Sequence, residues 1–499
     1  MNIVFYHRTS AGIENLGIES LSAVLKRAGH SVMLVLDEKT SFDNEKEVGQ
    51  IVQKVKAFSP HLICFSVFTE TYAYALKFAQ IFKEQLDPKI PNAFGGIHVT
   101  SVPESVIASE WVDYGMIGES ESAILEFIEA LEGKRSFEDV ANLIYKDKTA
   151  IKKNKLQPYC RNLDSLPFLD KDIFYSKIPS LAKDYYILTG RGCPFDCSYC
   201  CNSIFHNLYG FEPNHLRRRS VANVIEELSI AKKKYKPDMI SFLDDIFVLR
   251  PKEWLYPFLE EYKAKIDLPF YCQIHPNFIQ KDIVDSLIQA KCWNITVGIQ
   301  SGSQRIRGDF FGRSYRDDTQ GAHSNAKIAE VCKVIKKAGA FLTVDIIFGC
   351  PTENQKDVDD SVDVIEQIVP SRVTNFFLAY YPNTKLTNEA IQSGLLDKEI
   401  PTKFMDGKFV TKDFIFKQAG EYLMDKASGK MYAEAQAKMQ LVCIFQNTKI
   451  ARAFYGILKV IPYPLILWVA KGLSILSALI NFDRRGYQRI RVKFGKRQG

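Results

Sequence analysis

The sequence predicts an α/β protein in three parts: a Rossmann-like parallel sheet over residues 1–150, a partial (βα)6 barrel over residues 185–385 and a mainly helical region over residues 386–499. Short apolar runs alternate with amphipathic segments through the first two parts, which is typical of parallel strands covered by helices. The chain has 499 residues, enough for about three domains. Its 46% hydrophobic content supports a large core and excludes a disordered chain.

Residues 1–150 show this alternation first. Ligands of such sheets bind beyond the carboxyl ends of the strands, where glycine lets a backbone approach a bulky ligand. The turns at those ends are therefore candidate binding residues, although ordinary strand-to-helix turns have the same composition. The predicted strands are Asn2–Tyr6, Ser31–Leu36, His61–Val67, Ala93–Gly96 and Tyr114–Ile117, and the predicted helices are Gly17–Arg27, Thr71–Glu84 and Ser120–Glu132. The candidate turn residues are Ser66, Thr69, Gly95, Gly96, His98, Gly118 and Glu119.

Residues 151–184 contain Pro158, Pro167 and Pro179 and have no sustained period, so we expect an interdomain linker there. Residues 185–385 then repeat a strand and a helix, which predicts an incomplete α/β barrel with active-site groups at the carboxyl ends of its strands. Its predicted strands are Tyr185–Thr189, Met239–Leu243, Pro269–Gln273, Ile295–Ile299, Phe341–Phe348 and Thr374–Tyr380. Its predicted helices are Val221–Tyr235, Glu253–Lys263, Lys281–Ala290, Ala326–Ala338 and Val358–Ile368.

A cysteine motif directly follows the first barrel strand. Cys193, Cys197 and Cys200 have the spacing CxxxCxxC on one short loop. Three thiolates there can hold three irons of a [4Fe–4S] cluster and leave the fourth iron open for a substrate. A structural zinc site is the alternative, but zinc needs a fourth ligand and the chain has no second CxxC-type pair. Cys201 is adjacent to Cys200 and is a poor fourth ligand.

This motif, with Tyr199 inside it, resembles the signature of the radical S-adenosylmethionine (SAM) superfamily, whose fold is also a partial barrel. The resemblance implies that the open iron binds SAM, which is cleaved to methionine and a 5′-deoxyadenosyl radical. It also implies SAM contacts at the ends of later strands, and the common form has a glutamate where this chain has Gln300. The residues that the resemblance assigns to SAM are Tyr199, Asp244, Asp245, Gln300, Ser301, Ile346 and Gly349.

The turns of residues 1–150 resemble the cobalamin-binding domain that precedes many such barrels. The resemblance implies that Leu16 and Gly17, together with the seven turn residues named above, contact cobalamin. The Asp-x-His-x-x-Gly motif that supplies a histidine to cobalt elsewhere is absent, and His98 follows Gly96 rather than an aspartate. We therefore expect cobalamin to bind with no histidine ligand.

The C-terminal region contains an apolar stretch from Tyr455 to Phe482 that Pro462, Pro464 and Lys471 interrupt. The interruptions argue against a spanning helix, which needs about 20 apolar residues. Two alternatives remain, a helix lying in an anionic membrane surface and a helix packed in the core. Seven basic residues follow from Arg484 to Gly499 with no acidic one, whereas the rest of the chain has 58 basic and 58 acidic residues. The neutral body argues against a nucleic-acid partner.

The combined resemblance predicts an enzyme that methylates an unactivated carbon of a small-molecule, lipid or isoprenoid substrate. A radical cyclase or rearrangement enzyme without methyl transfer, and a non-enzymatic iron–sulfur protein, are the alternatives. We expect a reducing partner of the flavodoxin or ferredoxin type and a cytoplasmic location, with the inner membrane face as an option. Four further residues are candidates for the barrel mouth, although a structural role is favoured for each: His275, Arg313, Tyr315 and Tyr380.

Overall fold

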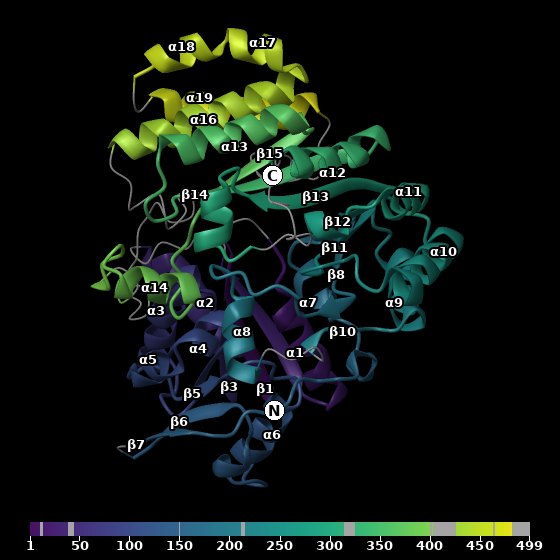
Figure 1. The fold of residues 1–499 in the computed structure, drawn as a ribbon. Helices are drawn as coiled ribbons and strands as arrows, with labels where there is room; N and C mark the ends of the chain where they lie inside the picture. The colour runs from purple at the N-terminus through teal and green to yellow at the C-terminus, as the bar shows by residue number, and fades with distance from the viewer. Residues whose placement is uncertain are drawn as a thin grey trace. The chain divides into compact units, whose positions relative to one another are not determined.

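The structure is a computed structural model that describes residues 1–9, 13–37, 44–148, 150–210, 215–313, 325–399, 402, 426–462 and 465–481. Three sequence predictions lie outside the described residues. They concern Tyr315, Tyr463 and the basic tail that begins at Arg484. The chain forms two compact units (Figure 1). Unit 1 comprises residues 1–182, 200–217 and 380–415, and unit 2 comprises residues 183–199, 218–379 and 416–499.

Unit 1 is built on a seven-stranded sheet of order β2-β1-β3-β4-β5-β6-β7. The first five strands are parallel, as the sequence predicts. The sheet also contains an antiparallel hairpin, β6 and β7, that the sequence pattern did not predict. The strands are β1 (Asn2–Arg8), β2 (Ser31–Asp37), β3 (Leu62–Ser66), β4 (Asn92–Gly95), β5 (Tyr114–Met116), β6 (Leu143–Asp147) and β7 (Ala150–Lys153).

The helices of unit 1 begin mostly at the strand ends. Helix α2 was not predicted, although Val48, Val52 and Val55 have helical spacing and are buried. The helices are α1 (Leu16–Arg27), α2 (Glu45–Ala57), α3 (Thr69–Gln85), α4 (Ile97–Ser101), α5 (Pro103–Ala108), α6 (Ala123–Leu131), α7 (Asp172–Tyr175), α8 (Asn202–Tyr209) and α14 (Lys385–Gln392).

The segment expected to be a linker is part of unit 1 instead. Residues 151–182 lie within this unit, and Phe174 of α7 is completely buried. Lys171 is also buried, and its ammonium group lies 2.9 Å from a carboxylate oxygen of Glu14 and 2.8 Å from one of Glu19. The segment lacks a period because it folds as short turns, yet its apolar and charged side chains still pack in the core of unit 1.

Unit 2 contains the partial barrel. Its six strands are parallel and follow the chain in order, β8-β11-β12-β13-β14-β15. All of the predicted barrel strands and helices are present, with ends that differ by three residues or fewer. The strands are β8 (Asp184–Ile187), β11 (Met239–Phe242), β12 (Phe270–Ile274), β13 (Cys292–Gln300), β14 (Phe341–Phe348) and β15 (Arg372–Phe377), and the helices are α9 (Val221–Lys234), α10 (Tyr256–Lys265), α11 (Lys281–Gln289), α12 (Asn325–Lys337) and α13 (Gln355–Ile368).

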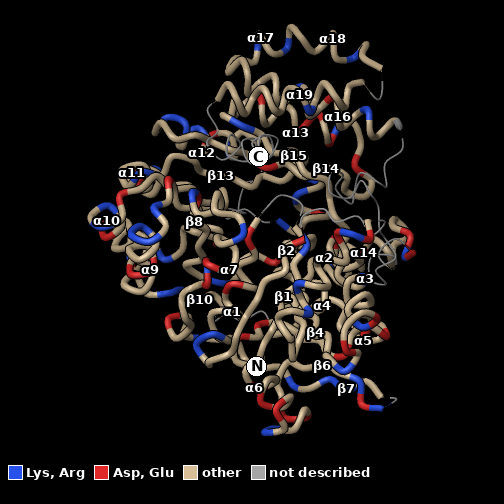
Figure 2. Tube along the Cα trace, turned by 180° about the vertical axis from the view of Figure 1, so that it is seen from behind, with Lys and Arg blue, Asp and Glu red and all other residues tan. Residues whose placement is uncertain are grey.

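Helices cover this sheet, and α9, α10 and α11 each contain both basic and acidic residues (Figure 2). Four further helices end unit 2, which confirms the helical C-terminal region. They are α16 (Lys426–Phe445), α17 (Thr448–Ala453), α18 (Tyr455–Val460) and α19 (Leu465–Ile480). Helix α16 packs on α13 and β15, and α19 packs on α16.

Replacing Lys171 tests the structural role of the buried triad. In Lys171→Met two carboxylates stay buried without their cation, so we expect the free energy of unfolding to fall by about 3–5 kcal/mol. Urea unfolding followed by circular dichroism measures the change. The control Lys152→Met alters an exposed lysine of β7 and should change that free energy by less than about 0.5 kcal/mol. A loss of equal size in both variants would show that the triad contributes little.

Candidate active site

The cysteine loop follows β8 and the short strand β9 (Gly190–Arg191). Gly192 begins it with a φ of +95°, a conformation that glycine adopts without the steric cost of a side chain. Cys197 is buried, Cys193 and Cys200 are half-buried, and Cys201 is exposed. Helix α8 begins directly after the loop. The loop therefore presents three cysteines of intermediate or low exposure on a tight backbone turn.

Residues 310–313, which follow β13, hold this loop in place. The backbone N–H of Ser198 donates to the carbonyl of Phe311 at 3.0 Å, and the Tyr199 and Phe311 rings lie 4.7 Å apart. The guanidinium of Arg313 donates to Cys197 Sγ at 3.7 Å, to the Tyr199 hydroxyl at 3.4 Å and to the carbonyl of Gly298 at 2.5 Å. Arg313 is 8% exposed. One side chain thus joins the cysteine loop to the end of β13.

His275 packs against the same loop. Its ring stacks on Phe195 with the ring centroids 3.9 Å apart, and Asn277 N–H donates to its Nδ1 at 3.2 Å. Burial, and secondly the charge of Arg313, hold the pKa of His275 well below its ordinary value. The imidazole is therefore neutral at neutral pH and acts as a flat packing surface for the loop.

The two adjacent aspartates after β11 have different environments. Asp244 is buried and accepts hydrogen bonds from the Thr189 hydroxyl at 2.7 Å and from Arg218 at 3.1 Å, whereas Asp245 is exposed. Burial raises the pKa of Asp244, and the Arg218 charge opposes this shift. Arg218 also lies over the Trp254 ring at 4.3 Å. Asp244 therefore ties the end of β8 to the end of β11.

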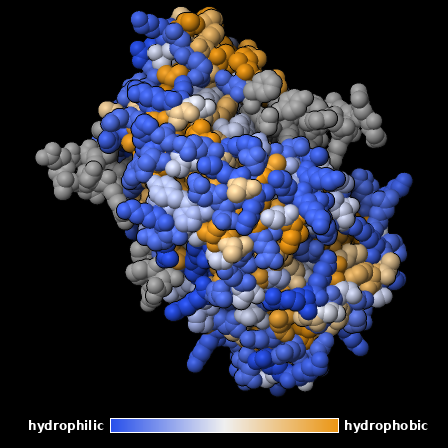
Figure 3. All heavy atoms as spheres, turned by 90° about the vertical axis from the view of Figure 1, so that its right-hand side faces the viewer, coloured by the Kyte–Doolittle hydropathy of each residue, from blue (hydrophilic) through white to orange (hydrophobic). Residues whose placement is uncertain are grey.

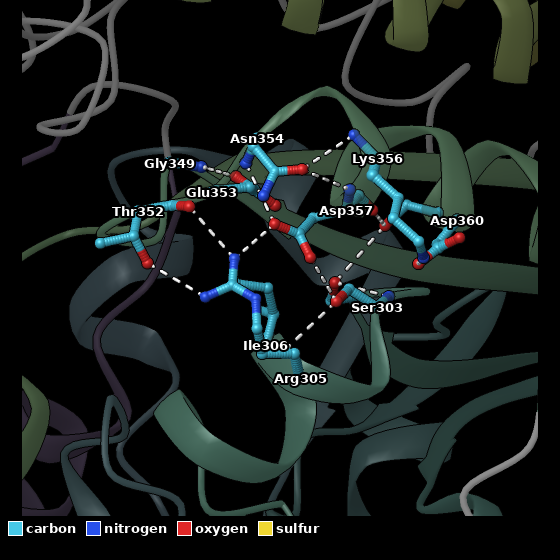
Figure 4. Close-up of polar contacts among 12 residues, drawn as sticks. Ser303, Arg305, Ile306, Gly349, Thr352, Glu353, Asn354, Lys356, Asp357 and Asp360 are labelled. Carbon is cyan, nitrogen blue, oxygen red and sulfur yellow. Dashed lines mark hydrogen bonds and ion pairs between the residues drawn. The ribbon is translucent and has the colours of Figure 1, made fainter.

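A polar network joins the ends of β13 and β14 (Figure 4). Ser303 donates to Asp357 at 2.6 Å, and Arg305 pairs with the same carboxylate and donates to the Thr352 hydroxyl at 3.0 Å. Asn354 caps α13. The network brings together the two strand ends that the sequence assigns to SAM.

The predicted SAM residues at these ends differ in accessibility. Ser301 and Ile346 are completely buried, so their side chains belong to the core. Gln300 is half-buried with a φ of +74°, and its amide fills the space that a Cβ at Gly298 would need. Gly349 donates its N–H to Glu353 at 2.7 Å, and burial raises the pKa of Glu353 to about 7.

In unit 1 the predicted cobalamin residues lie at the carboxyl ends of β1, β3, β4 and β5, and β1 lies between β2 and β3 in the sheet. Such a reversal of strand order is where open α/β sheets bind ligands. Gly96 is exposed at this edge, and its Cβ position would lie 2.7 Å from the Val67 carbonyl oxygen, so only glycine fits there. The other residues at the edge are Leu16, Gly17, Ser66, Thr69 and Gly95.

His98, by contrast, is completely buried. Its ring lies 4.3 Å from the Tyr72 ring and its Nδ1 is 3.1 Å from the Thr69 hydroxyl. The imidazole therefore packs inside unit 1, and the accessible part of this turn is the Gly95-Gly96 backbone.

Gly118 and Glu119 are contacted by the segment that follows Cys200. Arg217 forms two hydrogen bonds of 2.7 Å to the Glu119 carboxylate, and Glu119 N–H donates to the Tyr209 hydroxyl at 3.3 Å. The Tyr209 hydroxyl also occupies the space that a Cβ at Gly118 would need. Arg217 lies over the Tyr159 ring at 4.2 Å. These contacts anchor α8 to the end of β5.

The donor set of the cysteine loop fits an iron–sulfur cluster. Within the described residues, no group of three or more His, Cys, Asp or Glu side chains could hold a single metal ion. A cubane instead bonds each thiolate to a different iron, so its ligands do not converge on one ion. The Arg313 contact to Cys197 suits a thiolate, because a cation beside sulfur favours the deprotonated form. The exposed glycine backbone at the edge of unit 1 likewise fits a large planar ligand.

The sequence pattern marks Arg313 only as a candidate for the barrel mouth, with no indication of its contacts. No pattern in the sequence points to Thr189, Arg218, Tyr209 or Arg217. Arg313 lies 116 residues after Cys197 in the chain, and Arg217 lies 98 residues after Glu119. Isolated arginines at such separations carry no local pattern. Their roles become visible when the fold brings the segments together.

Two family models match the chain. The Radical SAM superfamily matches residues 187–365, and the B12 binding domain matches residues 9–128. The chain is 26% identical over 459 residues to an uncharacterized methyltransferase of Pyrococcus horikoshii, covering 89% of this chain and 93% of that protein. It is 22% identical over 417 residues to the anaerobic magnesium-protoporphyrin IX monomethyl ester cyclase of Cereibacter sphaeroides, covering 78% and 63% of the two chains.

Solved structures agree on the fold. TsrM, a radical SAM methyltransferase of Kitasatospora setae, superposes with a TM-score of 0.63 at 16% identity, covering 79% of this chain and 76% of that chain. The cobalamin-dependent radical SAM enzyme OxsB superposes with a TM-score of 0.60 at 16% identity, covering 83% and 56%. The domain order, a B12-binding domain and then a radical SAM barrel, matches the order predicted from the motifs.

The cofactors are therefore a [4Fe–4S] cluster, SAM and cobalamin, and the protein is an enzyme. The chain belongs to the radical SAM superfamily, in the class whose members carry an N-terminal B12-binding domain.

Proposed function

We propose that this enzyme methylates an unactivated carbon of a small-molecule substrate. The observation that carries the proposal is the pairing, in one chain, of the cysteine loop after β8 with an exposed glycine edge on a B12-binding domain. The similarity to a methyltransferase over 89% of the chain supports it. When bound, the cluster with SAM supplies a radical, and cobalamin supplies a methyl group.

The residues of this chain would bind and orient these groups. Cys193, Cys197 and Cys200 would hold the cluster, with an electron supplied by a flavodoxin or ferredoxin type of partner. Accessible groups near the loop and the strand ends, namely Tyr199, Asp245, Gln300 and Gly349, would contact SAM. The Gly95-Gly96 backbone would receive cobalamin, with no histidine ligand to cobalt.

A cyclase or rearrangement enzyme is the second candidate. The similarity to a magnesium-protoporphyrin cyclase over 78% of this chain favours it. Both candidates need the same cofactors, so what separates them is whether a methyl group is transferred to the product. The non-enzymatic alternative loses its support, because the chain belongs to a superfamily of enzymes.

We further propose that the C-terminal helices bind an anionic membrane surface, at the inner face of the cytoplasmic membrane. Ile466 and Ala470 of α19 are buried, as in a helix packed in the core. Trp468 is 74% exposed and Val460, at the end of α18, is 78% exposed, and these exposed apolar side chains support the proposal. Apolar atoms gather over these helices (Figure 3). No described helix is long and apolar enough to cross a membrane.

The net positive charge of the C-terminal sequence also supports binding to an anionic membrane surface. Between residues 448 and 499 the chain has eleven basic residues and one acidic residue, Asp483. An apolar face beside basic residues is typical of helices that lie in the interface of anionic lipids. A membrane-bound enzyme would meet lipid or isoprenoid substrates there. One relative, the hopanoid C-3 methylase of Methylococcus capsulatus, is named for a lipid. It is 23% identical to this chain over 255 residues.

An experiment with methyl-labelled SAM distinguishes a methylase from a cyclase even when the substrate is unknown. The reduced holoenzyme is incubated anaerobically with methyl-labelled SAM, and the corrinoid fraction is isolated. We expect label in the corrinoid, because a methylase must load its carrier from SAM. Enzyme lacking cobalamin is the control. Cleavage of SAM with no label in the corrinoid would support the cyclase and contradict the methylase.

Two neighbouring cysteines give a matched test of the cluster. Cys197→Ser should lose most of the iron of the reconstituted protein, about four irons per chain in the wild type, and its visible absorbance. Cys201→Ser alters the exposed neighbour and should keep both. Iron analysis and absorbance spectra measure the outcome. Full iron in the Cys197 variant would contradict the ligand assignment.

Membrane binding is tested on the exposed apolar face. The double variant Val460→Glu, Trp468→Glu should lose co-sedimentation with phosphatidylglycerol vesicles, because it puts charge where the side chains would enter the lipid. Ile230→Glu alters a 48% exposed residue of α9 and should bind as the wild type does. Salt should weaken wild-type binding without abolishing it, since charges are screened over about 10 Å at 0.1 M. No binding of the wild type at low salt would overturn the proposal.

A further inference from the structure

The contact between Arg313 and Cys197 has a consequence for electron transfer. Arg313 lies in the short segment after β13 whose backbone accepts from Ser198 and whose Phe311 ring packs on Tyr199. The backbone and the ring of Phe311 therefore place Arg313 beside the loop, independently of the hydrogen bonds that Arg313 itself makes. Its guanidinium then reaches Cys197 Sγ at 3.7 Å while its other nitrogen is held by the carbonyl of Gly298.

The chemistry of this contact favours a charged sulfur. Arginine stays protonated at any physiological pH, so Arg313 is a permanent positive charge. Arg313 is 8% exposed and Cys197 is 6% exposed, and screening by water is weak at such burial. A cluster thiolate would receive a charge-assisted hydrogen bond from the guanidinium.

We infer that Arg313 sets the reduction potential of the cluster, a role that rests on the proposed ligation by Cys197. Reduction adds one electron to the cluster, from the flavodoxin or ferredoxin type of partner, and makes and breaks no bond. The added negative charge is stabilised by a nearby cation and by a hydrogen bond to a cluster sulfur, both of which raise the potential of iron–sulfur clusters. Arg313 is thus a positioning and electrostatic residue that makes reduction easier.

The second partner of Arg313 links this effect to the loop. The guanidinium also donates to the Tyr199 hydroxyl, at 3.4 Å. Tyr199 lies between Cys197 and Cys200 in the motif. The same side chain that raises the potential therefore also helps to keep the turn between these two cysteines in one conformation.

Potentiometric titration followed by electron paramagnetic resonance tests the inference on holoenzyme without SAM. Arg313→Gln removes the charge and should shift the midpoint potential to a more negative value. Arg313→Lys keeps the charge and should lie between the wild type and the glutamine variant. Lys337→Gln is the control, because it removes an exposed positive charge of α12 in the same unit and should leave the midpoint potential unchanged.

Iron content of each variant shows whether the cluster is assembled, and this keeps the inference separate from the ligand assignment. Failure of Cys197→Ser to lose iron would overturn the ligation, whereas an unchanged potential in an iron-loaded Arg313→Gln protein would overturn the role of Arg313 alone. A variant that weakens SAM binding but keeps the SAM-free potential would also overturn it, since Arg313 would then serve SAM. If Arg313→Gln assembles no cluster, Arg313→Met serves as the uncharged variant. A more negative potential in Arg313→Met than in Arg313→Lys supports the charge effect, and an equal or higher potential contradicts it.

Discussion

The cysteine loop has little regular secondary structure, so the contacts made by residues 310–313 determine where its thiols lie. A loop of this kind has a large conformational entropy that packing must offset. Here the backbone of Phe311, its ring and the guanidinium of Arg313 each contact a different residue of the loop. The proposed SAM site depends on this attachment, because the strand ends that we propose to contact SAM could act with the cluster only if the thiols keep a constant position relative to them.

The strand ends are themselves held by buried polar groups rather than by apolar packing alone. Thr189, Asp244 and Arg218 connect β8 with β11, and Ser303, Asp357 and Arg305 connect the ends of β13 and β14. Buried polar groups are costly when they lack partners, so satisfied networks specify one geometry. A buried carboxylate engaged in this way, such as Asp244, orients neighbouring strands, whereas the adjacent Asp245 is exposed.

Helix α19 of the C-terminal region has apolar side chains on both its buried and its exposed sides. Helix α19 packs Ile466 and Ala470 toward α16 and leaves Trp468 and Leu465 exposed. Burial of the first set stabilises unit 2, at roughly 25 cal/mol per Å² of apolar surface. Exposure of the second set carries no such benefit in water, and the proposed contact with a membrane surface would remove these side chains from water.

The sequence by itself determined the order of the barrel strands and helices and the spacing of Cys193, Cys197 and Cys200, because these features depend on residues near one another in the chain. The resemblance of its motifs to known families identified the two cofactor domains. It did not determine that residues 151–182 pack into unit 1, that His98 is buried, or that β6 and β7 form an antiparallel hairpin. The tertiary structure also decided the partners of Arg313 and Arg217, which lie about a hundred residues from the groups they bind. The physical reason is that local periodicity encodes secondary structure, whereas a hydrogen bond between distant segments exists only once the packing of the core has placed both of them.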